Sequence, residues 1–256
     1  PEVEAVIIRS DIIDKAVLDN APKLKIVVRA GAGYDNVDLT AATAHNVVVM
    51  NTPGQNSNAV AELAFGMMVY QIRNHFNGSS GTELMGKKIG IHAYGNVGKH
   101  VARIAKGFGM EVYAFDPFVS KEAIEKDGIV AVSTVEELYS TCQFVSLHIP
   151  ANDKTKKSIN FELLSKMPLG AMLINTARKE VICEEGLQKI LAERKDFSYV
   201  SDVAPDCKQS LEPFADKCFF SPKKMGAQTA EANINAGVAA AQQIIAFFNH
   251  NDVTFK

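Results

Sequence analysis

The stretch Lys88-Ile-Gly-Ile-His-Ala-Tyr-Gly-Asn-Val-Gly98 decides the fold. An apolar, strand-like run leads into Ala93-x-Gly95-x-x-Gly98, and a helical pattern follows, which is the context that a dinucleotide fingerprint requires. Gly95 would let the main chain approach a pyrophosphate, and Gly98 would let helix and strand pack closely. The helix N-terminus would supply amide hydrogens and a positive dipole. The turn therefore predicts a dinucleotide site.

Two residues decide how well this fingerprint is formed. Ala93 stands where the first glycine is usual; the position needs a tight turn more than a missing side chain, so we expect the methyl group to fit. Asp116 ends the next strand-like run, about twenty residues on, where an acid accepts hydrogen bonds from the adenosine ribose. Its carboxylate would repel a 2′-phosphate, which predicts NAD over NADP. Alone, Asp116 before Pro117 is a turn former, and the glycines are turn residues.

Eight short apolar, β-branched runs are spread over the chain, most of them separated by helical patterns. This alternation is typical of a parallel α/β architecture. The runs are Ala5–Ile8, Lys25–Val28, Val47–Met50, Lys88–Ile91, Glu111–Phe115, Phe144–Leu147, Ala171–Ile174 and Tyr199–Val203. The helical pattern after Gly98 has one apolar face, expected to lie on the sheet, made by Val101, Ile104, Ala105 and Phe108.

Two segments suggest how the chain is divided. Asn74–Thr82 is the strongest loop signal and precedes a new strand, as at the entry to a second unit. The last helical pattern, Ala230–Phe248, follows all the strands and could return to the first unit. Its apolar stripe, typical of a helix face that packs on a core, consists of Ile234, Val238, Ala241, Ile245 and Phe248.

Composition limits the classes of function. A chain of 256 residues, 47% of them hydrophobic, can bury a large core in one large or two modest domains. A net charge of −2 gives no reason to expect nucleic acid or an anionic membrane as partner, and favours a small soluble ligand. Ala59–Tyr70 is shorter than the roughly 20 residues of a membrane span. The spacing of the four cysteines, Cys142, Cys183, Cys207 and Cys218, forms neither a CxxC pair nor a metal-ligand cluster. We therefore expect free thiols, no metal site and a cytoplasmic protein.

Polar residues follow two buried-looking strands where ligands of parallel sheets bind. In Asn175-Thr-Ala-Arg178, the arginine can clamp the carboxylate of a 2-hydroxy acid bidentately, although a lone arginine is more often a surface charge. Asp202 could meet a nicotinamide carboxamide or simply end its strand in a turn.

Together these residues resemble the D-isomer-specific 2-hydroxyacid dehydrogenases over nearly the whole chain. The resemblance implies a Rossmann domain (54–228) inserted into a smaller, flavodoxin-like substrate domain (1–53 and 229–256). The chain begins at Pro1, so we expect further N-terminal strands to be missing. The matching runs are Arg29-Ala-Gly-Ala-Gly-Tyr-Asp-Asn-Val-Asp38, Asn51-Thr-Pro53, Ala61-Glu62, the glycine motif, His148-Ile-Pro150, Ile174-Asn-Thr-Ala-Arg178, Asp202-Val203 and Gly226-Ala227.

The resemblance also assigns binding residues. Those expected to bind NAD are Tyr94, Gly95, Asn96, Val97, Gly98, Asp116, His148, Ile149, Pro150, Thr155, Thr176, Ala177, Arg178, Asp202, Gly226 and Ala227. Within the family, the N-terminal runs most resemble phosphoglycerate dehydrogenases, in which Arg9 would approach the substrate phosphate. The Gly31–Gly33 loop could form an anion nest or be only a tight turn. The expected substrate-binding set is Arg9, Ser10, Arg29, Gly31, Ala32, Gly33 and Asn56.

Two departures from the family pattern concern proton transfer. Lys224 stands where the family has a histidine before Gly-Ala, with Lys223 beside it as an alternative. Cys207 falls where the family has a glutamate, and Asp206 offers a carboxylate one residue earlier. The pattern resembles a lysine-bearing subgroup without a C-terminal regulatory domain. We expect Arg178 to anchor the substrate, Lys224 to take the hydroxyl proton and Asp206 to orient the lysine, whose ordinary pKa of about 10.4 must then be tuned.

The resemblance therefore predicts NAD-dependent oxidation of D-3-phosphoglycerate to 3-phosphohydroxypyruvate, the first step of serine biosynthesis by the phosphorylated route. Alternatives are another D-2-hydroxy acid, such as lactate or glycerate/glyoxylate, or an NAD-sensing scaffold like the corepressors of this fold. A homodimer or larger homo-oligomer is implied by the resemblance alone.

Overall fold

The computed structural model describes all residues, 1–256, and the chain divides into two compact units. The smaller unit comprises residues 1–59 and 227–256, and the larger comprises residues 60–226. The chain enters the larger unit within helix α3 (Ser57–Ile72) and leaves it after Gly226. The larger unit is therefore one continuous segment, whereas the smaller one is built from both ends of the chain.

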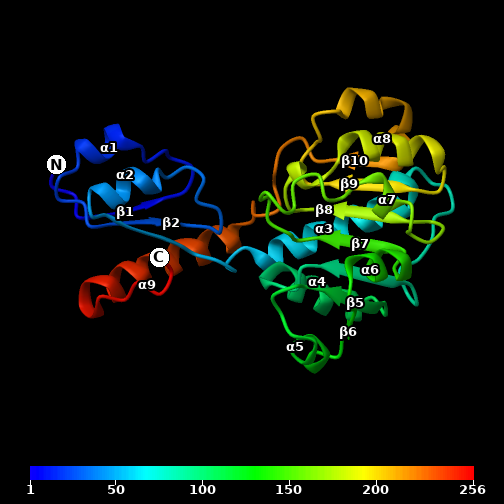
Figure 1. Ribbon diagram of the computed structural model, residues 1–256, viewed down its shortest axis with the longest axis horizontal. Helices are drawn as coiled ribbons and strands as arrows, with labels where there is room; N and C mark the ends of the chain where they lie inside the picture. Colours follow the sequence, from blue (N-terminus) through cyan, green and yellow to red (C-terminus); the bar gives the residue numbers. More distant parts are fainter. The chain divides into compact units, whose positions relative to one another are not determined.

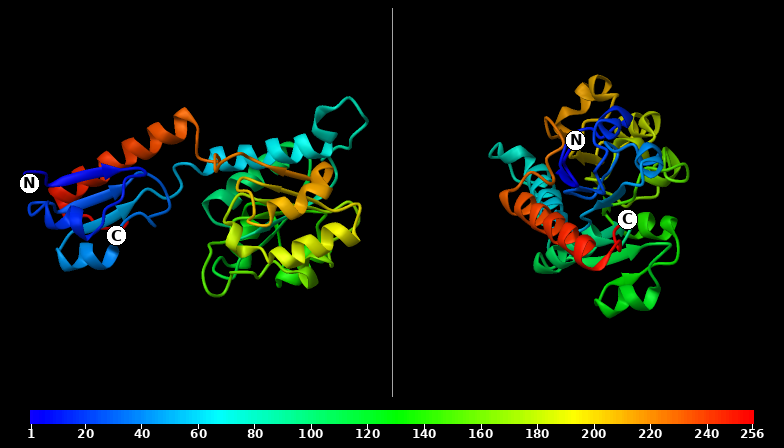
Figure 2. Two further views of the ribbon diagram at one scale, coloured as in Figure 1. Left: turned by 90° about the horizontal axis from the view of Figure 1, so that it is seen from above. Right: turned by 90° about the vertical axis from the view of Figure 1, so that its left-hand side faces the viewer.

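The smaller unit is a parallel three-stranded sheet, in the order β1-β2-β3, between two layers of helix. Helices α1 and α2 cover one face, and α9 covers the other, as the left panel of Figure 2 shows. Asp14 and Asp38 cap the first two helices by accepting hydrogen bonds from main-chain amides. The elements are β1 (Ala5–Ile8), α1 (Lys15–Asp19), β2 (Ile26–Arg29), α2 (Leu39–Ala44), β3 (Val48–Asn51) and α9 (Ala230–His250).

The apolar stripe expected on the last helix does not face this sheet. Ile234 and Ile245 are 63% and 59% exposed, and the rest of the stripe is exposed as well. The buried positions of α9 are Ala232, Ala236 and Ala240, which repeat every fourth residue along one side. Ala236 and Ala240 pack on the sheet together with the half-buried Ile244 and Phe247, so the packed face is a different one from the expected stripe.

The larger unit is a seven-stranded parallel sheet in the order β10-β9-β8-β7-β4-β5-β6, with helices on both faces (Figure 1). Helices α3 and α4 pack on one face, and α6, α7 and α8 pack on the other. The strand order reverses between β4 and β7, where open α/β sheets bind their ligands. The architecture confirms the expected α/β class. No helix of the chain has both the length and the apolar character needed to cross a membrane.

The bounds of these elements differ little from the expected runs. Two short strands, β6 and β10, were not expected. Phe108, which was expected to lie on the sheet, is 40% exposed at the C-cap of α4 and stacks on Phe65. The elements are η1 (Asn74–Phe76), β4 (Lys88–His92), α4 (Asn96–Gly107), β5 (Glu111–Phe115), α5 (Lys121–Lys126), β6 (Val130–Ala131), α6 (Val135–Thr141), β7 (Phe144–Leu147), α7 (Phe161–Leu164), β8 (Met172–Asn175), η2 (Lys179–Val181), α8 (Glu184–Glu193), β9 (Ser198–Ser201), η3 (Lys208–Lys217) and β10 (Cys218–Phe220).

Candidate active site

The glycine turn between β4 and α4 has the geometry of a dinucleotide site. No atom lies within 4 Å of the place where a side chain on Gly95 would begin, so the main chain is open to a ligand there. A Cβ on Gly98 would lie 2.4 Å from the carbonyl oxygen of Ala93, so only glycine allows the helix to approach the strand this closely. Gly95 precedes α4 and no side chain caps that end, which leaves main-chain amides for an anion.

Ala93 corrects one expectation about this turn. Its φ is +82°, in the left-handed region that favours glycine, so the position needs more than a tight turn. A side chain in this region costs about 1–2 kcal/mol. The conformation is held from both sides: Ala93 N donates to Phe115 O at 2.9 Å, and the next amide, of Tyr94, donates to the Asp116 carboxylate.

Asp116, which was expected to accept hydrogen bonds from the ribose, also stabilises the glycine turn. Its Oδ2 accepts from Tyr94 N at 2.7 Å, and its Oδ1 accepts from Phe118 N at 2.8 Å. A carboxylate has about four lone-pair sites, so both oxygens can still accept from a ligand. Its role toward a ribose stays a prediction.

Two histidines lie side by side at the switch point. His148 follows β7, and its amide donates to the carbonyl oxygen of His92, the last residue of β4. Burial lowers the pKa of His92 to about 4, although the Asp116 carboxylate acts in the opposite direction, and burial together with the neighbouring His92 lowers the pKa of His148 to about 3. Both rings are therefore neutral at pH 7. Beyond Pro150, the Thr155 hydroxyl donates to the Pro150 carbonyl at 2.5 Å and braces the loop.

Arg178 and Lys224 converge on one carbonyl oxygen. Lys224 Nζ donates to Ala177 O at 2.7 Å, and Arg178 Nη1 donates to the same atom at 3.2 Å. The buried Asn175 shapes this segment, because its Oδ1 accepts from Ala177 N at 2.9 Å and its Nδ2 donates to Arg178 O at 3.0 Å. The buried Thr176 hydroxyl has no protein partner. Lys224, rather than its neighbour Lys223, therefore lies beside the proposed substrate anchor.

Asp202 bonds to the loop that carries Lys224. Its side chain is 1% exposed. Oδ1 accepts from Met225 N at 2.8 Å and lies 3.0 Å from Ser221 Oγ, and Oδ2 accepts from Gly226 N at 2.8 Å. Its expected contact with a nicotinamide stays a prediction.

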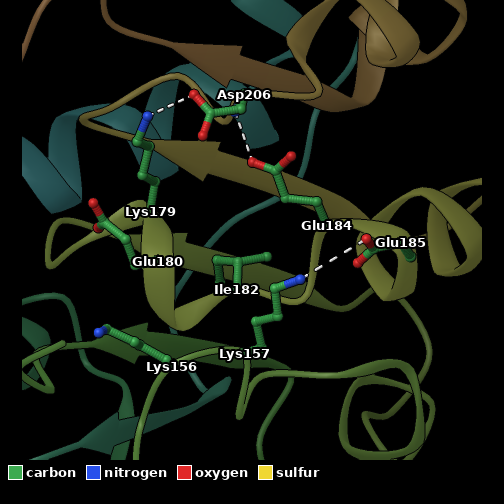
Figure 3. A pocket seen from close by; sticks show the side chains of 8 residues that line it. All are labelled: Lys156, Lys157, Lys179, Glu180, Ile182, Glu184, Glu185 and Asp206. Carbon is green, nitrogen blue, oxygen red and sulfur yellow. Dashed lines mark hydrogen bonds and ion pairs between the residues drawn. The ribbon is translucent and has the colours of Figure 1, made fainter. Parts of the chain in front are cut away.

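Asp206 forms an ion pair with Lys179 that was not expected. Its Oδ1 lies 2.5 Å from Lys179 Nζ, and both side chains line a cavity of about 510 Å³ (Figure 3). Its amide donates to Glu184 Oε1 at 2.6 Å. The carboxylate that was expected to orient Lys224 is therefore bonded to Lys179, and its role toward Lys224 stays a prediction.

Cys207 does not replace the missing glutamate as a base. Burial, aided by the neighbouring Glu184 carboxylate, raises the pKa of its thiol to about 11, so the thiol is neutral near pH 7. Glu184 Oε2 instead accepts from the amide of Cys207 at 2.9 Å. A carboxylate thus reaches this segment from α8, where it binds main chain.

The expected substrate residues lie in the smaller unit, at the carboxyl ends of its strands. Arg9 follows β1, and its Nη1 donates to Ala30 O, just beyond β2, at 2.8 Å. Gly31 has a φ of +146°, which L side chains rarely adopt, and a Cβ there would displace the Arg29 guanidinium. Asn51 Nδ2 donates to Ala32 O at 2.7 Å, which ties the 31–33 loop to β3. Ser10 is exposed, and Gly33 and Asn56 are half-buried.

Comparison with known proteins identifies the family. Residues 64–222 match the D-isomer specific 2-hydroxyacid dehydrogenase, NAD binding domain. The chain belongs to this family. The larger unit thus carries an NAD-binding domain, in agreement with the glycine turn and with the predicted cofactor.

Three relatives place the chain within the family. It is 33% identical to D-3-phosphoglycerate dehydrogenase of Methanocaldococcus jannaschii, over 95% of this chain and 49% of that protein. It is 33% identical to hydroxypyruvate reductase of Thermotoga maritima, over 95% and 84% of the two chains. A crystal structure of NAD⁺-bound 3-phosphoglycerate dehydrogenase from Entamoeba histolytica is 48% identical, with a TM-score of 0.89, over 100% of this chain and 82% of that one. The chain spans about half the length of the curated phosphoglycerate dehydrogenases it matches.

Sequence reasoning missed the residues that support this site. Asn175 belongs to a motif that the family shares, yet only the buried position of its side chain shows what it does. Ser221 is 2% exposed and bonded to Asp202, but in sequence it is a lone serine before a proline, with no pattern to single it out.

Proposed function

We propose that this chain carries the dehydrogenase activity of its family, with D-3-phosphoglycerate as substrate and NAD as hydride acceptor. The observation that carries the proposal is the convergence of Lys224 and Arg178 on the carbonyl oxygen of Ala177. It brings a group able to move a proton beside a group able to bind a carboxylate. Two relatives, both phosphoglycerate dehydrogenases, support the choice of substrate.

Each residue has a proposed role in the oxidation. Arg178 binds the substrate carboxylate through paired hydrogen bonds, which places the C2 hydroxyl. Lys224, in its neutral form, accepts the hydroxyl proton at Nζ, and in the reverse direction its ammonium returns it. Asn175 keeps Ala177 and Arg178 in position, because it bonds to the main chain of both. Arg9 binds the phosphate.

The fit of NAD rests on features of the larger unit. The open main chain at Gly95, the uncapped start of α4 and the carboxylate of Asp116 would hold the pyrophosphate and the adenosine ribose. When bound, the nicotinamide supplies the acceptor for the hydride from C2. The neutral rings of His92 and His148 add no positive charge beneath this site at pH 7.

The proton-transfer role is tested with adjacent lysines. Lys224→Ala should lower kcat about 10²- to 10⁴-fold, the usual contribution of a general acid or base, while NADH still binds. Lys223→Ala is the matched control and should retain near-normal turnover. The measurement is steady-state NADH formation from D-3-phosphoglycerate, with NADH affinity taken from fluorescence titration. Near-normal turnover of Lys224→Ala would sink the assignment.

The choice of substrate is tested at Arg9. A charge-assisted hydrogen bond contributes about 1.5–3 kcal/mol, so Arg9→Gln should lower kcat/KM for D-3-phosphoglycerate about ten- to a hundredfold. The same variant should leave kcat/KM for D-glycerate nearly unchanged, because that substrate lacks the phosphate. Equal losses for both substrates, or preference of the unchanged protein for D-lactate or D-glycerate, would point to another D-2-hydroxy acid. NADH binding without turnover of any of them would favour the sensing scaffold.

A further inference from the structure

We infer that Asp202 is a positioning residue for Lys224, through its hold on the loop 221–226; the inference rests on the proposed role of Lys224. Asp202 directly follows β9, and the loop directly follows the neighbouring strand β10. Both strands are parallel and in register up to the pair Ser201–Phe220, so the loop starts beside the carboxylate.

The carboxylate of Asp202 accepts hydrogen bonds from this loop. Three donors surround it: the Ser221 hydroxyl at 3.0 Å, and the amides of Met225 and Gly226 at 2.8 Å each. The Ser221 hydroxyl has one proton, which it shares between Oδ1 of this carboxylate and the Asp202 carbonyl oxygen, 2.7 Å from Oγ. A buried carboxylate with charge-assisted bonds to two consecutive amides is a firm anchor, because any movement of the loop would leave the charge unpartnered.

The two anchored amides immediately follow Lys224. They therefore fix the main chain from which the long side chain departs, while the bond from Nζ to Ala177 O fixes its far end. A lysine side chain has many rotamers, and holding one of them for proton transfer needs both ends defined. A side chain on Gly226 would lie 2.8 Å from Asp202 Oδ2, so the loop has no room to pack differently here.

The competing role for Asp202 is a direct contact with the nicotinamide carboxamide. Oδ1 already faces two donors and Oδ2 faces one, which leaves lone-pair capacity mainly on Oδ2. The two roles differ in what they predict. A cofactor contact acts on NADH affinity, whereas a hold on the loop acts on kcat and on its pH dependence.

Two variants separate these roles. Asp202→Asn keeps the volume but replaces one acceptor oxygen with an NH₂ group, which must face one of the loop amides. Ser221→Ala removes one loop bond and leaves the carboxylate intact. We expect Asp202→Asn to lower kcat about ten- to a hundredfold, as a misplaced catalytic group does, and to shift the pH profile of kcat. Ser221→Ala should change both in the same direction, by about threefold in kcat. NADH affinity should change less than about threefold in either.

Amide hydrogen exchange gives a readout independent of turnover. In Asp202→Asn, exchange at Met225 and Gly226 should accelerate about tenfold or more, while β8 and β9 keep their protection. The protected strands also show that the variant is folded, and Ser221→Ala tests the same bond network more mildly.

Three results would overturn the inference. The first is a loss of NADH affinity in Asp202→Asn with an unchanged pH profile and unchanged exchange at the loop. The second is an unaltered pH profile in both variants, with Lys224→Ala inactive; the proposed function then stands and only the positioning role fails. The third is an unchanged protein that forms no NADH from any D-2-hydroxy acid, or a fully active Lys224→Ala, in which case the proposed function fails first and the inference with it.

Discussion

Ala93 is a residue where a small change should stabilise the protein. Its positive φ costs a side chain about 1–2 kcal/mol, which exceeds the extra conformational entropy of glycine, about 0.5–1 kcal/mol. Ala93→Gly should therefore raise the free energy of unfolding slightly, by up to about 1 kcal/mol. The matched control is Ala123→Gly on exposed α5, where φ is ordinary and a loss of about 1 kcal/mol is expected. Urea unfolding measures both, and equal losses would show that Ala93 is unstrained.

Asp206 is the residue at which the expected orienting role toward Lys224 can be tested. It pairs with Lys179, and this exposed pair contributes little to stability. Asp206→Asn should therefore keep kcat within about threefold of the unchanged protein. The measurement is NADH formation across pH, with Lys224→Ala run alongside. A tenfold or larger loss in Asp206→Asn would restore the role first expected for it, as the residue that orients Lys224.

At this scale the sequence predicts residue types better than partners. Arg178 and Lys224 follow from their places after a strand and before Gly-Ala. The ion pair of Asp206 with Lys179 does not, because a motif carries no information on which loop brings a cation within reach of the carboxylate. The positive φ of Ala93 is hidden for the same reason, since a motif records residue order and not backbone angles.

His92 and His148, at the carboxyl ends of β4 and β7, should make the free energy of unfolding depend on pH. The pKa of His92 is about 4 in the folded protein, against an ordinary value of 6.5. Between these two pH values the unfolded chain therefore binds a proton at this residue, whereas the folded protein does not. The free energy of unfolding should fall as pH drops from about 6.5 to about 4, by at most about 1.4 kcal/mol per pH unit for this group. His148 adds a contribution of the same sign.

The check is urea unfolding at a series of pH values. His92→Gln removes the titrating group, so its slope between about pH 6.5 and 4 should be flatter than that of the unchanged protein. Parallel curves for His92→Gln and the unchanged protein would contradict the prediction.

Substitutions on the alanine face of helix α9 should destabilise the protein, whereas substitutions on its exposed apolar stripe should have little effect. Ala236 is fully buried against the sheet, so Ala236→Leu should overpack the interface and cost about 1–3 kcal/mol or more. Val238 is 52% exposed, and Val238→Ala should cost less than about 0.5 kcal/mol, because alanine is the better helix former. Thermal unfolding by circular dichroism compares them. The reverse order would mean that the stripe is the packed face.

Elements were predictable where the pattern is long. Each of the eight expected runs overlaps an observed strand, since several apolar residues in succession give a clear signal. Strands β6 and β10 have only two and three residues, too few for any periodicity, and they form because neighbouring strands offer an edge. The packed face of α9 was predicted wrongly, because a sequence pattern records which residues are apolar and not which of them fit against the sheet.

On the scale of the whole molecule, the chain crosses between its units twice, and the two crossings lie close together. A Cβ on Gly226, the last residue of the larger unit, would lie 3.3 Å from the side chain of Val60, its first. The smaller unit can therefore be viewed as one fold into which a second is inserted at a single place. The family resemblance implied this order of domains, but the exact bounds, within α3 and after Gly226, come only from the packing.

This arrangement predicts that the units fold unequally when separated. Segment 57–226 keeps α3, the whole seven-stranded sheet and both its core clusters, so it should unfold cooperatively and still bind NADH. Segment 1–59 should not fold alone, because Ile26, Val28 and Met50 lose the face of α9 that covers them.

Joining Ala59 to Ala227 through a short glycine linker should restore a cooperative fold to the smaller unit, since the two crossings are adjacent and the linker need span little. Circular dichroism melts of the three polypeptides, with NADH titration of the first, compare these outcomes. A linked smaller unit that stays unfolded while segment 57–226 folds would mean that the three-stranded sheet depends on the larger unit for stability. If segment 57–226 fails to fold as well, the units are not independent and the insertion is one of sequence only.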